Sequence, residues 1–265
     1  MTSGEMTVEI RTLLGITIAS LVGFSATANA DTAMQKKDVQ TIVHDYILQN
    51  PEVLVQSLQS FQQKQMEQTQ KSFTKIQEMA PKFSDRLFHQ STDPVAGNPN
   101  GKITLVEFSD YQCGHCINMS PVVDALIKKN PNLRVVLKEF PIRGPLSETA
   151  AKAAIAAQKQ GKYYEFRVAL MSNKNGSLTE EGIYNIAKSV GLDVNKLKTD
   201  MKSTDVAQQI KNNYKLAQDL QLMFTPVFFI AKSDINAKSN PDSVIFIPGG
   251  VDIEQLNQAI AKMNS

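Results

Sequence analysis

The chain has 265 residues, of which 42% are hydrophobic and 20% are charged. This composition is typical of a globular protein and excludes wholesale disorder. Its 28 basic and 26 acidic residues leave a net charge of +2, and no lysine- or arginine-rich tract suggests that it binds nucleic acid. The two cysteines, Cys113 and Cys116, are too close in the chain to join distant segments, which excludes a disulfide-scaffold protein.

The first 30 residues have the pattern of a signal peptide for export. Residues 12–26 are uncharged and largely apolar, and Ala28-Asn29-Ala30 offers the small residues that a signal peptidase accepts. The apolar run is short for a membrane span, which favours cleavage over the alternative of a retained anchor. Acidic residues ahead of the run are atypical and leave open whether translation starts at Met1 or Met6. We expect an exported protein in a compartment where disulfides persist.

Residues 31–90 are expected to form a helical arm ahead of the main domain. Apolar residues recur at helical spacing from Val39 to Ile47, on one face. Asn50-Pro51 ends this helix, because the residue before proline avoids the helical region, and a second helix is expected from Glu52 to Met79. Such helices need a surface on which to bury their apolar stripe. We expect a homodimer through residues 31–90; the alternative is a helix folded back onto its own domain.

A turn-rich segment, residues 91–101, is the expected linker to the main domain, residues 102–265. In that domain the apolar pattern is extended at residues 103–108, helical from Cys116 to Lys129, and extended again at residues 133–140. A strand, a crossover helix and a second strand of this kind form a right-handed parallel βαβ unit.

The rest of the main domain is expected to contain a helical insertion, two strands and a final helix. The insertion covers about residues 147–222. Apolar runs typical of buried strands follow at residues 227–230 and 244–247, and the last helix covers about residues 253–263. The predicted order is therefore βαβ, helical insertion, ββα, which is an α/β fold.

The motif Cys113-Gly114-His115-Cys116 lies at the predicted junction of the first strand and its helix. At a helix N-terminus, free N–H groups and the helix dipole favour a thiolate. We therefore expect Cys113 to attack disulfides and Cys116 to resolve the mixed disulfide. His115 is expected to stabilise the Cys113 thiolate; the alternative is an exposed histidine without that role.

A metal site is the chemical alternative for the two sulfurs. Structural zinc sites usually have four protein ligands, and His44 and His89 lie far away in the predicted arm. Cu(I), in contrast, can be held by two thiolates in a dimer. We expect no resident metal and no cofactor, and we keep a Cu(I)-binding protein as the alternative function.

Further motifs accompany the cysteines in a fixed order. Asp110-Tyr111 precedes them, Pro121 lies inside the following helix, Leu137 to Pro141 ends the second strand, Thr225-Pro226 opens the third, and a Pro-Gly-Gly precedes the last helix. From about residue 102 to 263 this order resembles the DsbA-like thioredoxin family. The resemblance implies a thioredoxin fold with an inserted helical domain, and a protein disulfide oxidoreductase or isomerase.

The resemblance also implies roles for residues outside the Cys-x-x-Cys motif. Thr225-Pro226 matches the family's cis-proline turn beside the disulfide, where the Thr225 backbone binds an extended client chain as an added strand. Glu107 and Lys138 match a buried acid and lysine beneath the cysteines. Such a pair takes up the proton of the resolving thiol, Cys116; a charge at a strand edge is the alternative for Glu107.

Three features depart from simple members of that family. Phe224 stands where glycine often precedes the Thr-Pro pair. Gly114-His115 replaces the Pro-His of strongly oxidising members and matches eukaryotic protein disulfide isomerases. The arm resembles those of Com-type surface antigens, ScsC-like proteins and dimeric periplasmic isomerases. These features favour a mixed oxidase and isomerase in the periplasm of a Gram-negative bacterium, or at its cell envelope or outer membrane.

The expected partners follow from this chemistry. Clients are exported proteins whose disulfides are formed or isomerised, and a second copy of the chain completes the homodimer. The cycle also needs a membrane redox partner, which is DsbB-like if the protein is reoxidised and DsbD-like if it is reduced. The sequence leaves that direction open. The alternative function is a surface antigen or a Cu(I) carrier that uses the cysteines as ligands.

Overall fold

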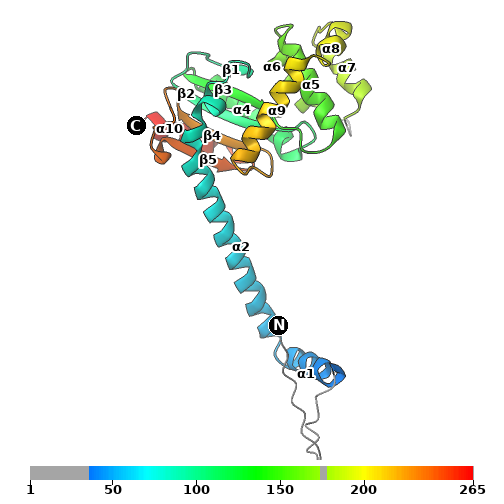
Figure 1. Ribbon diagram of the computed structural model, residues 1–265, viewed down its shortest axis with the longest axis vertical. Coiled ribbons are helices and arrows are strands. Elements are labelled where there is room, and N and C mark those ends of the chain that lie inside the picture. Colours follow the sequence, from blue (N-terminus) through cyan, green and yellow to red (C-terminus); the bar gives the residue numbers. More distant parts are fainter. Residues whose placement is uncertain (1–35, 174–177, 265) are drawn as a thin grey trace, which may run out of the picture. The chain divides into compact units, whose positions relative to one another are not determined.

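Residues 36–173 and 178–264 are described by the computed structural model of the protein (Figure 1). The expected signal peptide, residues 1–30, lies outside the described residues. Among the helices of the described part, none combines the length and the apolar character that a bilayer crossing needs. The chain divides into two compact units, residues 1–60 and residues 61–265.

The described part of the first unit is helical. Helix α1 spans Lys36–Gln49, and helix α2 begins at Glu52 and continues into the second unit to Met79. Asn50 follows α1, and its side-chain amide donates a hydrogen bond to the Tyr46 carbonyl at 2.8 Å. The two predicted helices are confirmed. Their exposed apolar side chains include Val39, Ile42, Val43, Tyr46, Leu48, Val53, Leu54, Val55 and Leu58.

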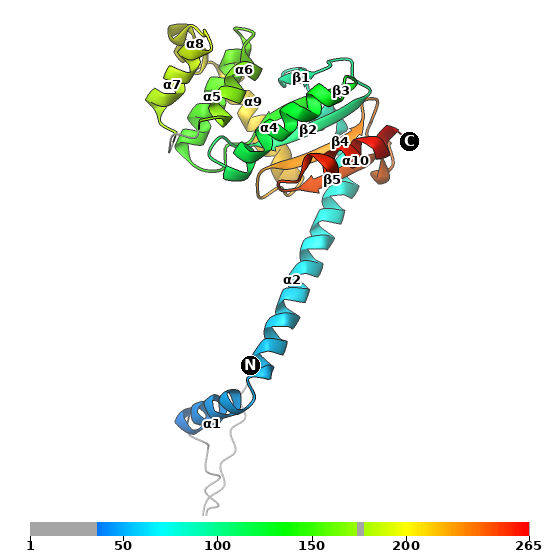
Figure 2. The ribbon, with the colours of Figure 1, turned by 180° about the vertical axis from the view of Figure 1, so that it is seen from behind.

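Within the described residues, the second unit is built on a five-stranded sheet in the order β1-β3-β2-β4-β5 (Figures 1 and 2). Strands β2 and β3 are parallel, and the other neighbouring pairs are antiparallel. Helix α4 connects β2 to β3, which confirms the predicted βαβ unit. The elements are β1 (Val95–Gly97), β2 (Ile103–Ser109), α4 (Gly114–Lys129), β3 (Leu133–Glu139), β4 (Val227–Lys232) and β5 (Val244–Pro248).

A helical insertion separates β3 from β4, as predicted (Figure 1). The helices are α5 (Pro145–Gln158), α6 (Tyr163–Met171), α7 (Glu180–Ser189), α8 (Val194–Asp200) and α9 (Thr204–Asp219), and α10 (Ile253–Asn264) follows β5. Side chains cap the start of α7 and α8: the Thr179 hydroxyl accepts the Gly182 N–H, and the Asp193 carboxylate accepts the Lys196 N–H. Buried alanines of α5 let α6 to α9 pack around it.

Successive strand residues point to opposite faces of the sheet and build two separate cores. Leu105 and Leu137 belong to the core beneath α4, α5 and α10, and Figure 2 shows α4 and α10 lying over the sheet. Val106 and Phe108 belong to the core on the other face. The end of α2, the short helices η1 (Ala80–Phe83) and α3 (Ser84–Phe88), and α9 cover that second core.

Two predicted boundaries are wrong, because the segment after α2 belongs to the second unit. Val95–Gly97, inside the expected linker at residues 91–101, forms β1 and pairs antiparallel with β3. Leu87 and Phe88 are fully buried, so residues 31–90 are not one separate arm. A three-residue strand between turn formers has too little periodicity to be recognised in the sequence.

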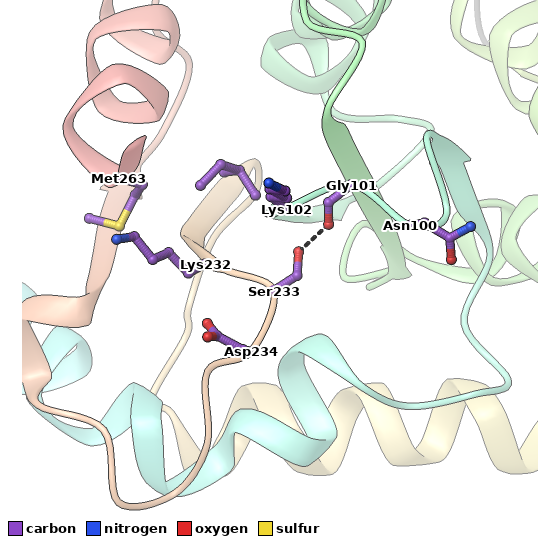
Figure 3. Close-up of a pocket in the computed structure, with 8 residues that line it drawn as sticks. Asn100, Gly101, Lys102, Lys232, Ser233, Asp234 and Met263 are labelled. Carbon is purple, nitrogen blue, oxygen red and sulfur yellow. Dashed lines mark hydrogen bonds between the residues drawn. The ribbon is translucent and has the colours of Figure 1, made fainter. Parts of the chain in front are cut away.

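A pocket of about 540 Å³ lies on the second unit where β2 begins and β4 ends (Figure 3). Lys102, Lys232 and Met263 are among its lining residues, and the Ser233 hydroxyl donates to the Gly101 carbonyl at 2.6 Å. The two cysteines follow the other end of β2. The pocket therefore lies at the opposite end of that strand from the redox motif.

Candidate active site

Cys113 and Cys116 lie at the start of α4, after the loop that follows β2. Cys113 is the N-cap residue, with φ −85° and ψ 113°, and its carbonyl accepts the Ile117 N–H at 3.0 Å. Both cysteines are free thiols and are fully buried, whereas Gly114 and His115 between them are exposed. The sulfurs are thus at the predicted junction of strand and helix.

The two thiols are electrostatically unequal. The Cys116 thiol donates to the Cys113 sulfur, and this bond, helped by the Thr225 side chain and nearby backbone N–H groups, lowers the pKa of Cys113 to about 4 although burial opposes the shift. Burial and the neighbouring Cys113 sulfur raise the pKa of Cys116 well above its usual range. At neutral pH the reduced site consequently holds a Cys113 thiolate and a Cys116 thiol.

His115 contributes to this site through its backbone. After the Cys116 thiol, which has the largest effect, the His115 N–H is one of the groups that lower the pKa of Cys113. The His115 residue as a whole is exposed. The stabilising role of its imidazole therefore stays a prediction.

The loop before β4 places Thr225-Pro226 against Cys113. The peptide bond between these two residues is cis, as the family resemblance implies. In the thiol form, Cys113 Sγ donates to the Thr225 carbonyl at 3.2 Å, and Thr225 is 6% exposed. The Pro226 carbonyl accepts the Gly249 N–H at 2.9 Å, which links this loop to the segment after β5. Two motifs more than a hundred residues apart in the chain thus meet at one sulfur.

Asp110 holds the loop that leads from β2 to the cysteines. Its Oδ1 accepts the Gln112 N–H and the Ser147 hydroxyl, each at 2.7 Å, and its Oδ2 accepts the Arg143 N–H at 2.9 Å. The side chain is buried, so these bonds are protected from water. The sequence identifies Asp110 only as part of a motif and does not predict its role in joining the cysteine loop to the start of the insertion.

Glu107 lies on the face of the sheet that α4 covers, and its partner is an arginine of the insertion. Arg167 Nη2 donates to Glu107 Oε2 at 2.7 Å, and both side chains are completely buried. Burial raises the pKa of Glu107, whereas the charge of Arg167 lowers it. Glu107 Oε1 and two Arg167 nitrogens have no protein partner, so the pair keeps capacity for further hydrogen bonds.

Lys138 does not join Glu107, so the expected pair is wrong. The lysine Nζ donates to the Asp93 carboxylate, and both side chains are buried on the other face of the sheet. The register explains the difference, because Glu107 lies opposite Leu137 and Lys138 lies opposite Phe108. Neighbouring positions on adjacent strands then point to opposite faces. Lys138 is therefore not beneath the cysteines.

A second buried carboxylate, Glu139, connects the cysteine loop to the insertion. The hydroxyls of Tyr111 and Tyr163 donate to its Oε1 at 2.7 and 2.5 Å. Burial raises the pKa of Glu139 to about 7, although the two tyrosines and Arg167 lower it. Tyr111 belongs to the motif before Cys113 and was a possible signal, whereas no sequence pattern pointed to Tyr163 or Arg167.

The hydrogen-bond partners of the other two histidines, His44 and His89, do not include the cysteines. His44 Nδ1 lies 3.1 Å from the Asp45 carboxylate on α1, and a ring nitrogen of His89 lies 2.8 Å from the Ile235 carbonyl. Across residues 36–173 and 178–264, no group of three or more histidines, cysteines or acidic residues is arranged to hold a metal ion.

Comparison with known proteins extends these observations. Residues 104–261 match the DSBA-like thioredoxin domain family, and residues 35–68 match the N-terminal domain of the copper resistance protein ScsC. BcfH of Salmonella enterica Typhimurium is 30% identical with a TM-score of 0.65, over 86% of this chain and 96% of that one. A thioredoxin-like oxidoreductase from Silicibacter pomeroyi DSS-3 is 39% identical with a TM-score of 0.60, over 67% and 95%.

Curated relatives include Na(+)/H(+) antiporters. The antiporter NhaA 1 of Mycobacterium sp. strain KMS is 28% identical over 143 residues, which are 52% of this chain and 23% of that protein. The chain thus spans less than a quarter of the length of the antiporters it matches. Ion transport is a property of those proteins. The family match at residues 104–261 covers more than half of the chain and includes both cysteines and Thr225-Pro226. The protein therefore belongs to the DSBA-like thioredoxin domain family, and its predicted thioredoxin fold with a helical insertion is confirmed.

Proposed function

We propose that the protein is a thiol:disulfide oxidoreductase that exchanges disulfides with exported proteins through Cys113 and Cys116. The observation that carries the proposal is the position of Cys113, whose pKa is lowered to about 4, at the N-terminus of α4 and against the cis Thr225-Pro226 peptide. Membership of the DSBA-like family supports it, as does the likeness to a solved thioredoxin-like oxidoreductase.

The exchange begins when the Cys113 thiolate attacks one sulfur of a client disulfide. A bond forms between that sulfur and Cys113, the client S–S bond breaks, and the other client sulfur leaves as a thiolate. Cys116, after losing its proton, then attacks Cys113 Sγ and releases the first client sulfur. The client has gained two electrons and the protein is left as the Cys113–Cys116 disulfide; the reverse sequence forms a disulfide in the client.

The proton of Cys116 needs a nearby acceptor, because burial makes its thiolate costly. We assign this role to Glu107, on the face of the sheet that α4 covers. Burial raises the pKa of Glu107, which makes its carboxylate a stronger proton acceptor than an exposed glutamate. Arg167, and not the predicted Lys138, is the basic residue that holds it in place.

Glu107→Gln is expected to slow the resolution step roughly tenfold or more, because it removes the proton acceptor but keeps a hydrogen-bonding side chain. The mixed disulfide, trapped with acid and followed by mass spectrometry, should persist longer while its rate of formation stays unchanged. Glu181→Gln, at an exposed position, is the matched control. A folded Glu107→Gln variant whose mixed disulfide decays at the wild-type rate contradicts the assignment.

The client is proposed to bind as an extended segment beside the cis peptide. Thr225 offers its backbone to the client in the manner of an added strand. Met223 and Phe224, which precede it, are 82% and 36% exposed and provide apolar surface next to that backbone. This arrangement favours unfolded or partly folded chains, whose backbone and apolar side chains are accessible.

The proposed activity includes both oxidation and isomerisation of disulfides in the periplasm. Gly114-His115 is the feature that favours a moderately oxidising site over a strongly oxidising one. A DsbB-like or a DsbD-like membrane protein then sets the resting redox state of Cys113 and Cys116. The export pattern of residues 1–30 supports the location.

Self-association through α1 and the first part of α2 is the last part of the proposal. None of the α1 residues is buried, and apolar side chains such as Tyr46, Leu54 and Leu58 are more than half exposed. Contiguous apolar surface of this kind usually marks an interaction site. The match of residues 35–68 to the ScsC N-terminal domain supports a defined role for the segment.

Leu54→Glu combined with Leu58→Glu is expected to convert the proposed homodimer into a monomer, because it places charge on the exposed apolar surface of α2. Sedimentation equilibrium measures the mass. Gln56→Glu combined with Gln59→Glu adds the same charge at exposed polar positions and should leave the mass unchanged. A Leu54/Leu58 variant that keeps the wild-type mass overturns the proposed interface.

Two assays test the proposed function: reduction of insulin and refolding of scrambled ribonuclease by the purified protein. We expect the protein to accelerate both, each through Cys113. The Cu(I)-carrier alternative predicts a different outcome, in which the protein binds Cu(I) through its thiols and accelerates neither reaction. That result would overturn the oxidoreductase proposal.

A further inference from the structure

The last turns of α2 pack against the loop that carries Thr225. The Phe73 ring meets the Phe224 ring edge-on, with centroids 6.1 Å apart and planes at 65°. It meets the Phe246 ring of β5 in the same manner at 5.7 Å, and Gln77 on the next turn accepts the Phe246 N–H through its side chain at 3.4 Å. All of these residues belong to the second unit. This end of α2 is therefore part of the catalytic unit.

Phe224 is one peptide bond away from the residue that contacts the nucleophile. The Thr225 carbonyl lies 3.2 Å from Cys113 Sγ, and Thr225 is almost completely buried. Met223, on the other side of Phe224, is 82% exposed and offers the loop little packing. The ring contact with Phe73 thus holds the loop at the position just before Thr225. It also gives Phe224 a structural role that glycine at this position cannot have.

We propose that Phe73 is a positioning residue for disulfide exchange, and that its ring, through Phe224, holds the Thr225 backbone against Cys113 where a client chain binds. This inference rests on the proposed function. Helix α2 then has two roles. Its first part carries the exposed apolar residues Leu54 and Leu58, and its last part supports the client-binding loop. A ring pair of this kind is worth roughly a 2- to 10-fold change in an equilibrium constant.

Phe73→Ala is the variant that tests the proposal. We expect the KM for a disulfide client to rise roughly 2- to 10-fold with a smaller change in kcat, because the client-binding backbone is less well held while the sulfurs remain in α4. We also expect the midpoint of the Cys113 titration to shift, because the loop carries both the Thr225 carbonyl, which accepts from the Cys113 thiol, and the Thr225 side chain, which lowers the Cys113 pKa. The Cys116 thiol has the largest effect on that midpoint, and the Thr225 side chain lowers it further.

Phe83→Ala is the matched control, because Phe83 is also half-buried against the same core but its ring contacts the Arg86 guanidinium. It should lower stability without moving KM or the titration. Phe73→Tyr keeps the ring and should behave as wild type, which guards against a Phe73→Ala variant that is poorly folded. The titration requires no client and is informative even if the protein exchanges no disulfides.

A double-mutant comparison decides whether Phe73 acts through Phe224. If it does, Phe73→Ala combined with Phe224→Ala should raise KM no further than Phe224→Ala by itself. Effects on KM that simply multiply overturn the proposal. Wild-type KM and titration in Phe73→Ala also overturn it, as does an equal change in Phe83→Ala.

Discussion

Cys113→Ser is expected to reduce the rates of insulin reduction and ribonuclease refolding to those of the buffer. Serine preserves the N-cap position at the start of α4. Its hydroxyl does not ionise at neutral pH and cannot form an S–S bond with a client, so neither reaction has a first step. No other cysteine in the chain can replace it, because the pKa of Cys116 is raised well above its usual range and its thiol holds the proton at neutral pH.

Cys116→Ser is the informative counterpart, because it removes the resolving thiol and keeps the nucleophile. This variant should accumulate a mixed disulfide between Cys113 and the client, visible by mass spectrometry, and should not turn over by the internal route. The adduct should also form more slowly at low pH than with the wild type, because the Cys116 thiol makes the largest contribution to the low pKa of Cys113. Full activity in Cys113→Ser, or an adduct on any other residue, contradicts the assigned roles.

The reduced protein is expected to be more stable than the oxidised protein at pH 7, and this difference should shrink as the pH falls. The Cys116 hydrogen bond is the largest cause that lowers the pKa of folded Cys113, from about 9 to about 4. Between these values the unfolded chain binds a proton that the folded chain does not, so stability rises with pH. The gain at pH 7 is at most ~4 kcal/mol and is reduced by solvent screening.

The disulfide itself acts in the opposite direction. Closing the short loop between Cys113 and Cys116 removes unfolded-state entropy worth ~2 kcal/mol. We therefore expect the reduced form to be favoured at pH 7 and the oxidised form at pH 4, where the thiolate contribution is lost. Glu139 also titrates near neutral pH, but it is present in both forms and cancels from their difference.

Urea unfolding of the two redox forms at pH 7 and pH 4 measures this difference. The control for loop-closure entropy is the Cys116→Ser variant, compared with its Cys113 free and with its Cys113 blocked by a small mixed disulfide, which closes no loop. An oxidised wild-type protein that is the more stable form at pH 7, or a difference that does not change with pH, contradicts the prediction.

The elements with strong periodicity were predictable from the sequence. Helix α2 begins and ends at the predicted Glu52 and Met79, and the predicted strands at residues 103–108 and 133–140 appear as β2 and β3 with small shifts at their ends. The short elements between α2 and β2 were not predictable. Strand β1 and helix α3 have three and five residues, which is too short for a hydrophobic period to show.

The candidate site was likewise predictable only where its residues belong to local motifs. Cys113, Cys116 and Thr225-Pro226 belong to local motifs, and the structure brings them together. The partners of the buried charges depend on strand register, because a shift of one residue changes the face on which a side chain lies. For this reason the family resemblance pairs Lys138 with Glu107, whereas the structure pairs it with Asp93. Arg167 comes from a helix 60 residues beyond Glu107, and no local pattern connects the two.

The central claim is that Cys113 is a thiolate at neutral pH, held ready for attack at the start of α4. The ultraviolet absorbance of the thiolate in the reduced protein, followed from low to high pH with Cys113→Ser as the blank, tests it most directly. We expect a midpoint near pH 4 that disappears in Cys113→Ser. A midpoint near 9, the usual value for cysteine, contradicts the account.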